Sequence, residues 1–247
     1  MTSPLFLVDP ERLDYDPIRL GGEEGWHAAA VRRIGVGEAI DLSDGHGHVA
    51  RCRVLEASRA DLICGVLERI DVPAPTPRLV VAQAPAKGDR AERSVELMTE
   101  VGVDEIVPWA ASRSIVRWDG DSSVKALRRW RSTAREAAKQ SRRAWLPVIT
   151  EPATTAQLAE RLTTAARAIV LHEDAKTPIG AVDPPSTGDI VLVVGPEGGI
   201  APDELTAFAA VGAEHVSLGP TVLRTSTAAA VASGVLLSRT ARWASGQ

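Results

Sequence analysis

The sequence is poor in cysteine and has no long apolar run. Its two cysteines, Cys52 and Cys64, are too few for a disulfide framework in a chain of 247 residues, so we expect reduced thiols in a cytoplasmic protein. The most apolar short runs, such as Ile190–Val194, fall far below the roughly 20 residues that a membrane-spanning helix needs. The first ten residues have no basic flank and include Asp9, which is not typical of a signal peptide. The sequence therefore predicts a cytoplasmic protein with no membrane partner.

Two common nucleotide-binding motifs are also missing. Neither Gly-x-Gly-x-x-Gly nor Gly-Lys-Ser/Thr occurs, which argues against a dinucleotide fingerprint and a P-loop. The five histidines and two cysteines are scattered, so we expect no metal site. An apolar content of 45% excludes a chain that is disordered throughout. The length fits one large domain or two ordinary ones.

The net charge of -4 is small, but the charge is segregated along the chain. Residues 1–72 contain 8 basic and 13 acidic residues, residues 78–150 contain 14 and 9, and residues 151–247 contain 6 and 10. Much of the positive charge lies on a helix predicted over residues 123–143. Its basic residues at three- or four-residue spacing share one face, and they are Arg128, Arg131, Arg135, Lys139 and Arg142. Such a face is either a phosphate-binding surface or a solvated helix surface.

Three prolines at alternate positions divide the chain. Pro73, Pro75 and Pro77 keep the backbone extended, so residues 73–77 are predicted to be a linker between domains or a rigid loop inside one. Residues 1–72 contain short alternating runs separated by turn residues, typical of a small β-barrel-like domain. Residues 78–247 alternate strands with helices, which predicts an α/β domain with a mostly parallel sheet.

The expected elements can be given as residue ranges. In the first segment, strands are expected at 38–43, 49–55 and 62–67, with a short helix at 24–34. In the second segment, strands are expected at 78–84, 105–109, 167–172, 190–194 and 215–218. Helices are expected there at 89–101, 123–143, 155–166, 202–211 and 225–243.

Two loops of the second segment have the composition of a ligand site. Gly195-Pro196-Glu197-Gly198-Gly199 follows a strand and precedes a helix, which is where ligands bind in α/β sheets. A tight turn without a ligand is the alternative. The second loop, 219–227, contains the lone cation Arg224 and precedes a helix of small residues, which we expect Thr225 to cap. That helix suits close packing against another helix or another chain, or burial in the core.

These motifs together resemble a known family. Gly195–Gly199 and Leu218-Gly219-Pro220-x-Val222-Leu223-Arg224-Thr225 are similar to the two C-terminal motifs of the bacterial 16S rRNA uridine-N3 methyltransferases, which belong to the SPOUT class. Further similar segments extend the resemblance over nearly the whole chain, and they are Lys87–Arg90, Thr99–Val103, Arg113-Ser114, Gln140–Arg143 with Pro147, and His27 with Arg32-Arg33 and Gly37. The chain departs from the family pattern at Leu97, Thr221 and Ser226.

The resemblance implies a fold, a cofactor and partners. The fold is a C-terminal α/β trefoil-knot domain with a small N-terminal PUA-like β-barrel that binds RNA. The cofactor is S-adenosylmethionine, and the implied pocket residues are Leu171, His172, Glu173, Gly195, Pro196, Glu197, Gly198, Gly199, Leu218, Gly219, Leu223, Arg224 and Thr225. A homodimer acting on 16S rRNA within the small ribosomal subunit is expected. The RNA-binding candidates are Arg32, Arg33, Lys87, Arg90, Arg113, Arg128, Arg131, Arg135, Lys139, Arg142 and Arg143.

The implied reaction is methyl transfer to N3 of a uridine. Arg224 is the catalytic candidate, because a cation stabilises negative charge that develops on the uracil oxygens. Glu197 and His172 are candidates for the base that removes the N3 proton. Two alternatives stay open: the same class of enzyme acting on a ribose 2′-OH or a tRNA base, and a non-catalytic RNA-binding protein in ribosome assembly.

Overall fold

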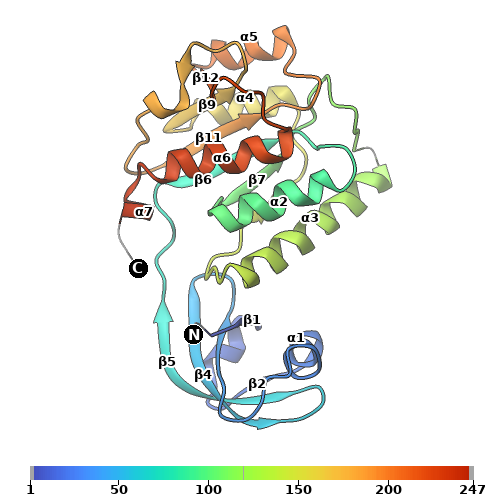
Figure 1. The fold of residues 1–247 in the computed structure, drawn as a ribbon, viewed down its shortest axis with the longest axis vertical. Coiled ribbons are helices and arrows are strands. Elements are labelled where there is room, and N and C mark those ends of the chain that lie inside the picture. The colour runs from blue at the N-terminus through green and yellow to red at the C-terminus, as the bar shows by residue number, and fades with distance from the viewer. Residues whose placement is uncertain (1–2, 119, 245–247) are drawn as a thin grey trace. The chain divides into compact units, whose positions relative to one another are not determined.

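A computed structural model describes residues 3–118 and 120–244 (Figure 1). The chain divides into two compact units, one formed by Met1–Ala74 with Ala138–Leu146 and the other by Pro75–Ala137 with Pro147–Gln247. The division falls inside the proline-rich segment. A short stretch from the middle of the sequence, 138–146, therefore groups with the N-terminal unit.

The first unit is built on a five-stranded sheet with the order β1-β3-β4-β5-β2. Its strands are β1 Leu5–Leu7, β2 Ile18–Leu20, β3 Ala39–Ser43, β4 His48–Ala57 and β5 Leu62–Asp71. In β4, Ala50 and Cys52 are buried whereas Arg51 and Arg53 are exposed, which is the two-residue period of a sheet with one buried face. The sequence pattern does not reveal β1 and β2, because three residues are too few to show an alternation.

The core of the first unit contains both cysteines. Cys52 and Cys64 are free and buried, among aliphatic residues such as Ile40 and Leu62. Burial raises the pKa of the Cys52 thiol to about 12 and that of the Cys64 thiol to about 11. The expectation of reduced core cysteines is therefore confirmed.

Residues 138–146 join the first unit through the turn between β3 and β4. Leu146 N–H donates to Gly45 O at 2.9 Å, and Gly47 N–H donates to Ala144 O at 3.0 Å. The indole N–H of Trp145 donates to Val72 O at 2.9 Å. The turn has positive φ at Gly45 (76°) and Gly47 (100°), a conformation that favours glycine.

The second unit is built on a seven-stranded sheet with the order β10-β12-β9-β11-β6-β7-β8, in which every pairing is parallel. Its strands are β6 Arg78–Gln83, β7 Glu105–Pro108, β8 Val148–Ile149, β9 Arg167–Leu171, β10 Thr177–Pro178, β11 Asp189–Val194 and β12 Glu214–Ser217. Its helices are α2 Arg90–Val101, α3 Gly120–Gln140, α4 Thr155–Thr163, α5 Pro202–Ala210, α6 Thr225–Leu237 and α7 Ala241–Ala244. The predicted α/β class with a parallel sheet is confirmed.

Helices cover both faces of this sheet because its strands are apolar on both sides. Leu79 and Leu192 face a cluster with residues of α2, α3 and α6, such as Trp130. Their strand neighbours Val80 and Val193 face a second cluster with residues of α4 and α5. In Figure 1, α2 and α6 lie side by side over one face, and the structure places them in contact.

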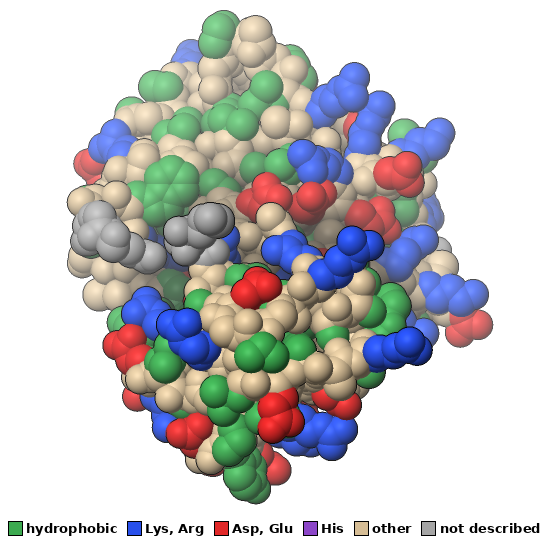
Figure 2. Space-filling view, turned by 60° about the horizontal axis from the view of Figure 1, so that its bottom comes forward, with side chains coloured by type: hydrophobic (Ala, Val, Ile, Leu, Met, Phe, Trp, Pro, Cys, Tyr) green, Lys and Arg blue, Asp and Glu red, His purple; other side chains and the backbone are tan. Residues whose placement is uncertain are grey.

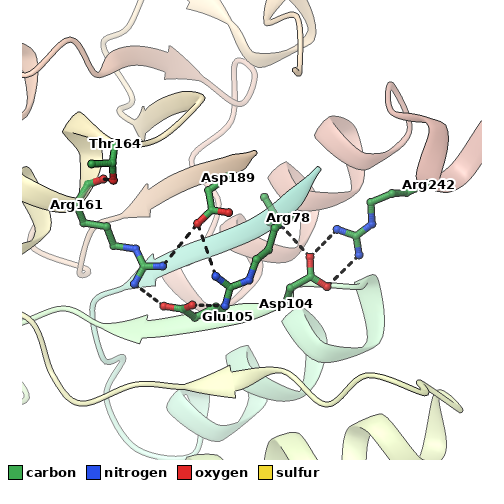
Figure 3. A network of polar contacts seen from close by, with 8 residues as sticks. Arg78, Asp104, Glu105, Arg161, Thr164, Asp189 and Arg242 are labelled. Atoms are coloured by element: carbon green, nitrogen blue, oxygen red, sulfur yellow. Dashed lines mark hydrogen bonds and ion pairs between the residues drawn. The ribbon is translucent and has the colours of Figure 1, made fainter. Parts of the chain in front are cut away.

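A network of ion pairs lies at the amino ends of the strands (Figure 3). Arg78, at the start of β6, pairs with Glu105, at the start of β7, and Arg161 pairs with the same carboxylate. Beside it, the guanidinium of Arg242 donates to both carboxylate oxygens of Asp104 at 2.6 and 3.1 Å. These residues occupy the edge of the sheet at which the strands begin. The loops that follow the strands lie at the opposite, carboxyl edge.

Several predicted helices end earlier than expected; α4, for example, ends at Thr163 rather than at residue 166. The helix predicted over 225–243 is interrupted after Leu237, where Thr240 Oγ1 donates to Leu237 O at 2.8 Å and accepts from Arg242 N–H at 3.3 Å. The basic helix ends at Gln140 rather than Arg143, and Arg142 has a φ of 58°. Among the described helices, none is long and apolar enough to cross a membrane.

Candidate functional site

Three loops that follow neighbouring strands meet at the carboxyl edge of the second sheet. The order β12-β9-β11 places 218–224, 171–174 and 195–201 next to one another, because parallel strands end at the same edge. These are the loops that contain the expected cofactor-binding residues. A crevice at the carboxyl ends of strands is the usual ligand position in open α/β sheets.

The glycine-rich loop after β11 is a compact structure in which the glycines are needed for close packing. A Cβ atom at Gly195 would lie 2.6 Å from Ile200 Cγ1, and one at Gly198 would lie 3.0 Å from Arg113 O. Gly199 has a φ of 73°, and its N–H donates to Pro196 O at 2.9 Å. The interpretation as a tight turn is therefore correct for the backbone, and it does not exclude a ligand at the loop surface.

Glu197 lies on the outside of this loop and contacts another candidate segment. It is exposed, and its Oε1 accepts from Lys87 N–H at 3.2 Å. The carboxylate therefore links the glycine-rich loop to the segment before α2. Lys87 keeps an exposed side chain at the same edge.

The loop after β12 presents unused main-chain donors. Within the part of the chain that the structure describes, the N–H groups of Gly219, Thr221, Val222 and Leu223 donate no hydrogen bond. Gly219 has a φ of 139° with open space where a Cβ would lie. Leu218, just before it, packs against the apolar cluster under α6. This loop thus combines an apolar floor with free hydrogen-bond donors.

Arg224 lies at the N-terminus of α6, where the structure changes one expectation. Arg224 itself, with a φ of -63° and a ψ of 144°, is the N-cap residue, and Thr225 is the first helical residue. The expectation that Thr225 caps the helix is therefore wrong. Thr225 is buried, whereas Arg224 is exposed. The guanidinium is available to a ligand at this edge.

The third loop is shaped by His172. Its N–H donates to Val216 O at 3.0 Å, which continues the pairing of β9 with β12. Its Nδ1 accepts from Asp174 N–H at 3.2 Å, and its ring lies 6.3 Å from that of His215. The His172 ring therefore takes part in the hydrogen bonding of this loop. Leu171 packs against the apolar cluster, and Glu173 is exposed.

The basic RNA-binding candidates are mostly exposed, in both units. Exposed side chains are those of Arg32, Arg33, Lys87, Arg90, Arg113, Arg128, Arg131, Arg135 and Arg142, and Arg143 is half-buried. On α3, Arg131 pairs with Glu151 at 2.8 Å, and Arg129 pairs with Glu92 at 3.2 Å. On the face drawn in Figure 2, basic side chains are interspersed with acidic ones. The face drawn there is therefore mixed in charge rather than a continuous basic patch.

Lys139 does not share the exposed face on which the helical spacing placed it. Its side chain is 8% exposed, and Nζ lies 3.0 Å from Glu24 Oε1, a carboxylate that is itself 13% exposed. Both residues belong to the first unit. Their ion pair is buried, which the sequence spacing could not reveal because Glu24 lies more than a hundred residues away. Another face of the same helix is buried, and it is formed by Leu127, Trp130, Ala134 and Ala137.

Two features of this edge escape sequence reasoning. Glu204 is 3% exposed and accepts hydrogen bonds from three different segments. A cavity lined in part by Ser114 and Trp118 lies beside the loops after β6 and β7. The only sequence feature that pointed to this cavity is the similarity of Arg113-Ser114 to a segment of the related family.

Comparison with known proteins agrees with this geometry. Residues 73–237 match the model of an RNA methyltransferase domain, and residues 20–67 match that of an RNA methyltransferase PUA domain. The chain is 47% identical to ribosomal RNA small subunit methyltransferase E of Mycobacterium bovis, over 98% of this chain and 94% of that protein. It is 30% identical to the protein of the same name from Bacillus subtilis, over 84% of each.

A solved structure from Legionella pneumophila superposes with a TM-score of 0.84 at 27% identity, over 97% of this chain and 99% of that one. That protein is described as a methyltransferase in complex with its bound cofactor S-adenosylmethionine. The sequence matches cover both units, and the family that the sequence resembles is confirmed. The chain belongs to the RNA methyltransferase family that includes the ribosomal RNA small subunit methyltransferases E.

Proposed function

We propose that this protein transfers a methyl group from S-adenosylmethionine to N3 of a specific uridine in 16S rRNA. The observation that carries the proposal is the meeting of three loops at the carboxyl edge of the β12-β9-β11 segment of the sheet. Family membership supports the reaction class. The uridine N3 acceptor rests on the motifs at residues 195–199 and 218–225.

The residues present fit the proposed cofactor. Its adenine and its amino acid end are rich in polar groups, and the loop after β12 offers unused N–H donors at 219 and 221–223 among the described residues. Leu171 and Leu218 supply apolar surface beside them. When bound, the cofactor supplies an activated methyl group on a sulfonium. The chain's own task is then alignment of the acceptor and handling of one proton.

Arg224 is proposed to stabilise the acceptor. N3 of uracil has a free lone pair only after it loses its proton, and the resulting negative charge spreads to O2 and O4. An exposed guanidinium at the start of α6 can bind such an oxygen. His172 and Glu197 already make loop contacts, which favours orienting roles for both.

RNA binding is proposed to use both units and a second copy of the chain. Exposed arginines lie on α3 and at 32–33 of the first unit. Val222, in the loop after β12, and Val231, in α6, expose 79% and 41% of their surface. A homodimer would cover these apolar groups. Within each chain, the C-terminal loops are proposed to form a trefoil knot. The compartment proposed is the cytoplasm, where the small ribosomal subunit is assembled.

Calorimetry with S-adenosylmethionine tests the cofactor site. We expect the wild-type protein to bind it, and we expect Gly219→Val to weaken binding because a φ of 139° is strained for a residue with a side chain. Gly180→Ala is the matched control, since Gly180 is exposed and a Cβ there meets nothing within 4 Å. Absence of binding to the wild-type protein would instead favour a non-catalytic RNA-binding protein.

A further inference from the structure

A cavity of about 320 Å³ lies among the loops that follow β6 and β7. Its volume is at the lower end of the roughly 300–1,000 Å³ range of small-molecule sites. Pro85, Pro108 and Val116 form apolar parts of its lining. Because Gln83 at the end of β6 pairs in register with Val194 and Pro108, the cavity opens at the same sheet edge as the glycine-rich loop.

The cavity contains an unsatisfied hydroxyl group. Ser114 lines it and is 9% exposed, and its Oγ is buried without a hydrogen-bond partner among the described residues. An unpaired buried hydroxyl costs free energy unless a ligand or water completes its hydrogen bonds. The hydroxyl lies just behind the cavity wall, so a rotation of the Ser114 side chain brings it to a polar ligand edge.

The lining also offers an aromatic side chain and an exposed cation. Trp118 is half-buried and is fixed by an edge-to-face contact with the buried Trp130, with ring centroids 4.8 Å apart and an interplanar angle of 76°. Arg117, next to it, is exposed and forms no ion pair with any described residue. An aromatic wall, a hydroxyl and an arginine are the groups that recognise a nucleotide, through stacking, a hydrogen bond and a phosphate contact.

The cavity adjoins the candidate cofactor site through Arg113. A Cβ atom at Gly198 would lie 3.0 Å from Arg113 O and 3.3 Å from Arg113 Cβ, so the residue before Ser114 touches the glycine-rich loop. Arg113 touches the loop that follows β11, and the next residue, Ser114, lines the cavity. A ligand in the cavity therefore lies close to that loop. This adjacency is what a two-substrate reaction requires.

We propose that this cavity receives the target pyrimidine base after it leaves the RNA stack. The Trp118 ring lies against the base, Ser114 Oγ donates to a uracil carbonyl oxygen, and Arg117 binds a flanking phosphate. The proposal rests on the proposed methyl transfer, because only that reaction requires an extruded base beside the glycine-rich loop. It assigns the recognition of the acceptor to the loop after β7.

Ser114→Ala separates this role from a structural one. Replacing an unsatisfied buried hydroxyl removes a cost to the folded state, so we expect the melting temperature to stay the same or rise. We expect kcat/KM for methylation of small ribosomal subunits to fall about tenfold, the effect of one lost hydrogen bond to the substrate. Cofactor affinity by calorimetry should not change. Ser186→Ala, at an exposed loop position, is the matched control and should change none of the three.

Trp118→Leu and Trp118→Phe test the stacking surface. The leucine variant should lose at least about tenfold in kcat/KM, and the phenylalanine variant should recover part of that loss because it keeps an aromatic face. Cofactor affinity should be unchanged in both. If the wild-type protein methylates RNA and both Ser114→Ala and Trp118→Leu do so at the wild-type rate, the base pocket lies elsewhere and the proposed function stands. A wild-type protein that binds no cofactor and transfers no methyl group would overturn the proposed function and this pocket with it.

Discussion

The main-chain N–H of Ser112 donates to the Glu204 carboxylate at 2.8 Å. Glu204 also accepts from Ala201 N–H at 3.0 Å and from Thr155 Oγ1 at 3.1 Å. One buried carboxylate therefore joins the loop after β7, the start of α5 and the start of α4. Ala201 follows the glycine-rich loop, and Ser112 lines the proposed base cavity. Both features are therefore supported by the same carboxylate, that of Glu204.

Glu204→Ala should destabilise the second unit and loosen its loops. The substitution leaves one buried and two partly buried donors without their acceptor, which we expect to cost about 2–4 kcal/mol of unfolding free energy. Glu204→Gln keeps one carbonyl oxygen and should cost less. Urea unfolding checks both. Asp203→Ala, at the exposed neighbouring position on α5, is the control, and an equal loss in that variant would mean that Glu204 has no special role.

Lys139→Ala should reduce stability rather than RNA affinity. The ammonium group and Glu24 form a buried pair, and removal of one partner leaves a buried charge that costs about 3–5 kcal/mol. The double variant Lys139→Met with Glu24→Met should recover much of this loss. Thermal unfolding measures the effect. A Lys139→Ala protein of wild-type stability would contradict the buried pair.

Arg128→Ala should show the opposite behaviour. Arg128 is exposed on α3, so the substitution should leave stability within about 0.5 kcal/mol. RNA affinity should fall, and the slope of log K against log salt concentration should lose about one unit. Arg239→Ala, which removes a surface pair with Asp183, is the control. If RNA binding and its salt dependence stay unchanged, this helix face is only a solvated surface.

Arg224→Ala should lower turnover more than RNA affinity. The guanidinium is proposed to stabilise charge that develops on the uracil, and loss of one such group typically costs about 10²–10³-fold in kcat. Single-turnover methylation and RNA binding, measured on the same preparation, separate the two effects. Arg224→Lys should recover part of the rate because it keeps a cation. Equal losses in rate and RNA affinity would assign Arg224 to RNA binding alone.

Much of the second unit follows from its sequence pattern. Ile190–Val194 and Ala168–Leu171 are apolar throughout, as strands covered on both faces must be, and the glycine-rich motif identifies the edge at which a ligand binds. The three-residue strands of the first unit carry no periodic signal. The break after Leu237 is accompanied by a hydrogen bond from the Thr240 hydroxyl, a contact that a helical pattern does not encode.

The acceptor side of the site is less predictable, for a physical reason. The cavity is bounded by residues such as Pro85, Trp118 and Pro152, which come from separate loops, and its unpaired hydroxyl is recognisable only once the surrounding atoms are placed. Lys139 illustrates the same limit. Helical spacing placed it among exposed arginines, and its partner Glu24 lies in a distant part of the chain.

Identification of the methylated nucleoside tests the central claim most directly. Small ribosomal subunits from a strain without this enzyme would be incubated with the protein and methyl-labelled S-adenosylmethionine, and the rRNA digested to nucleosides. The predicted result is label in N3-methyluridine from a single position of 16S rRNA. Label in a 2′-O-methylated nucleoside, or no label from a protein that binds the cofactor, would contradict the proposed reaction.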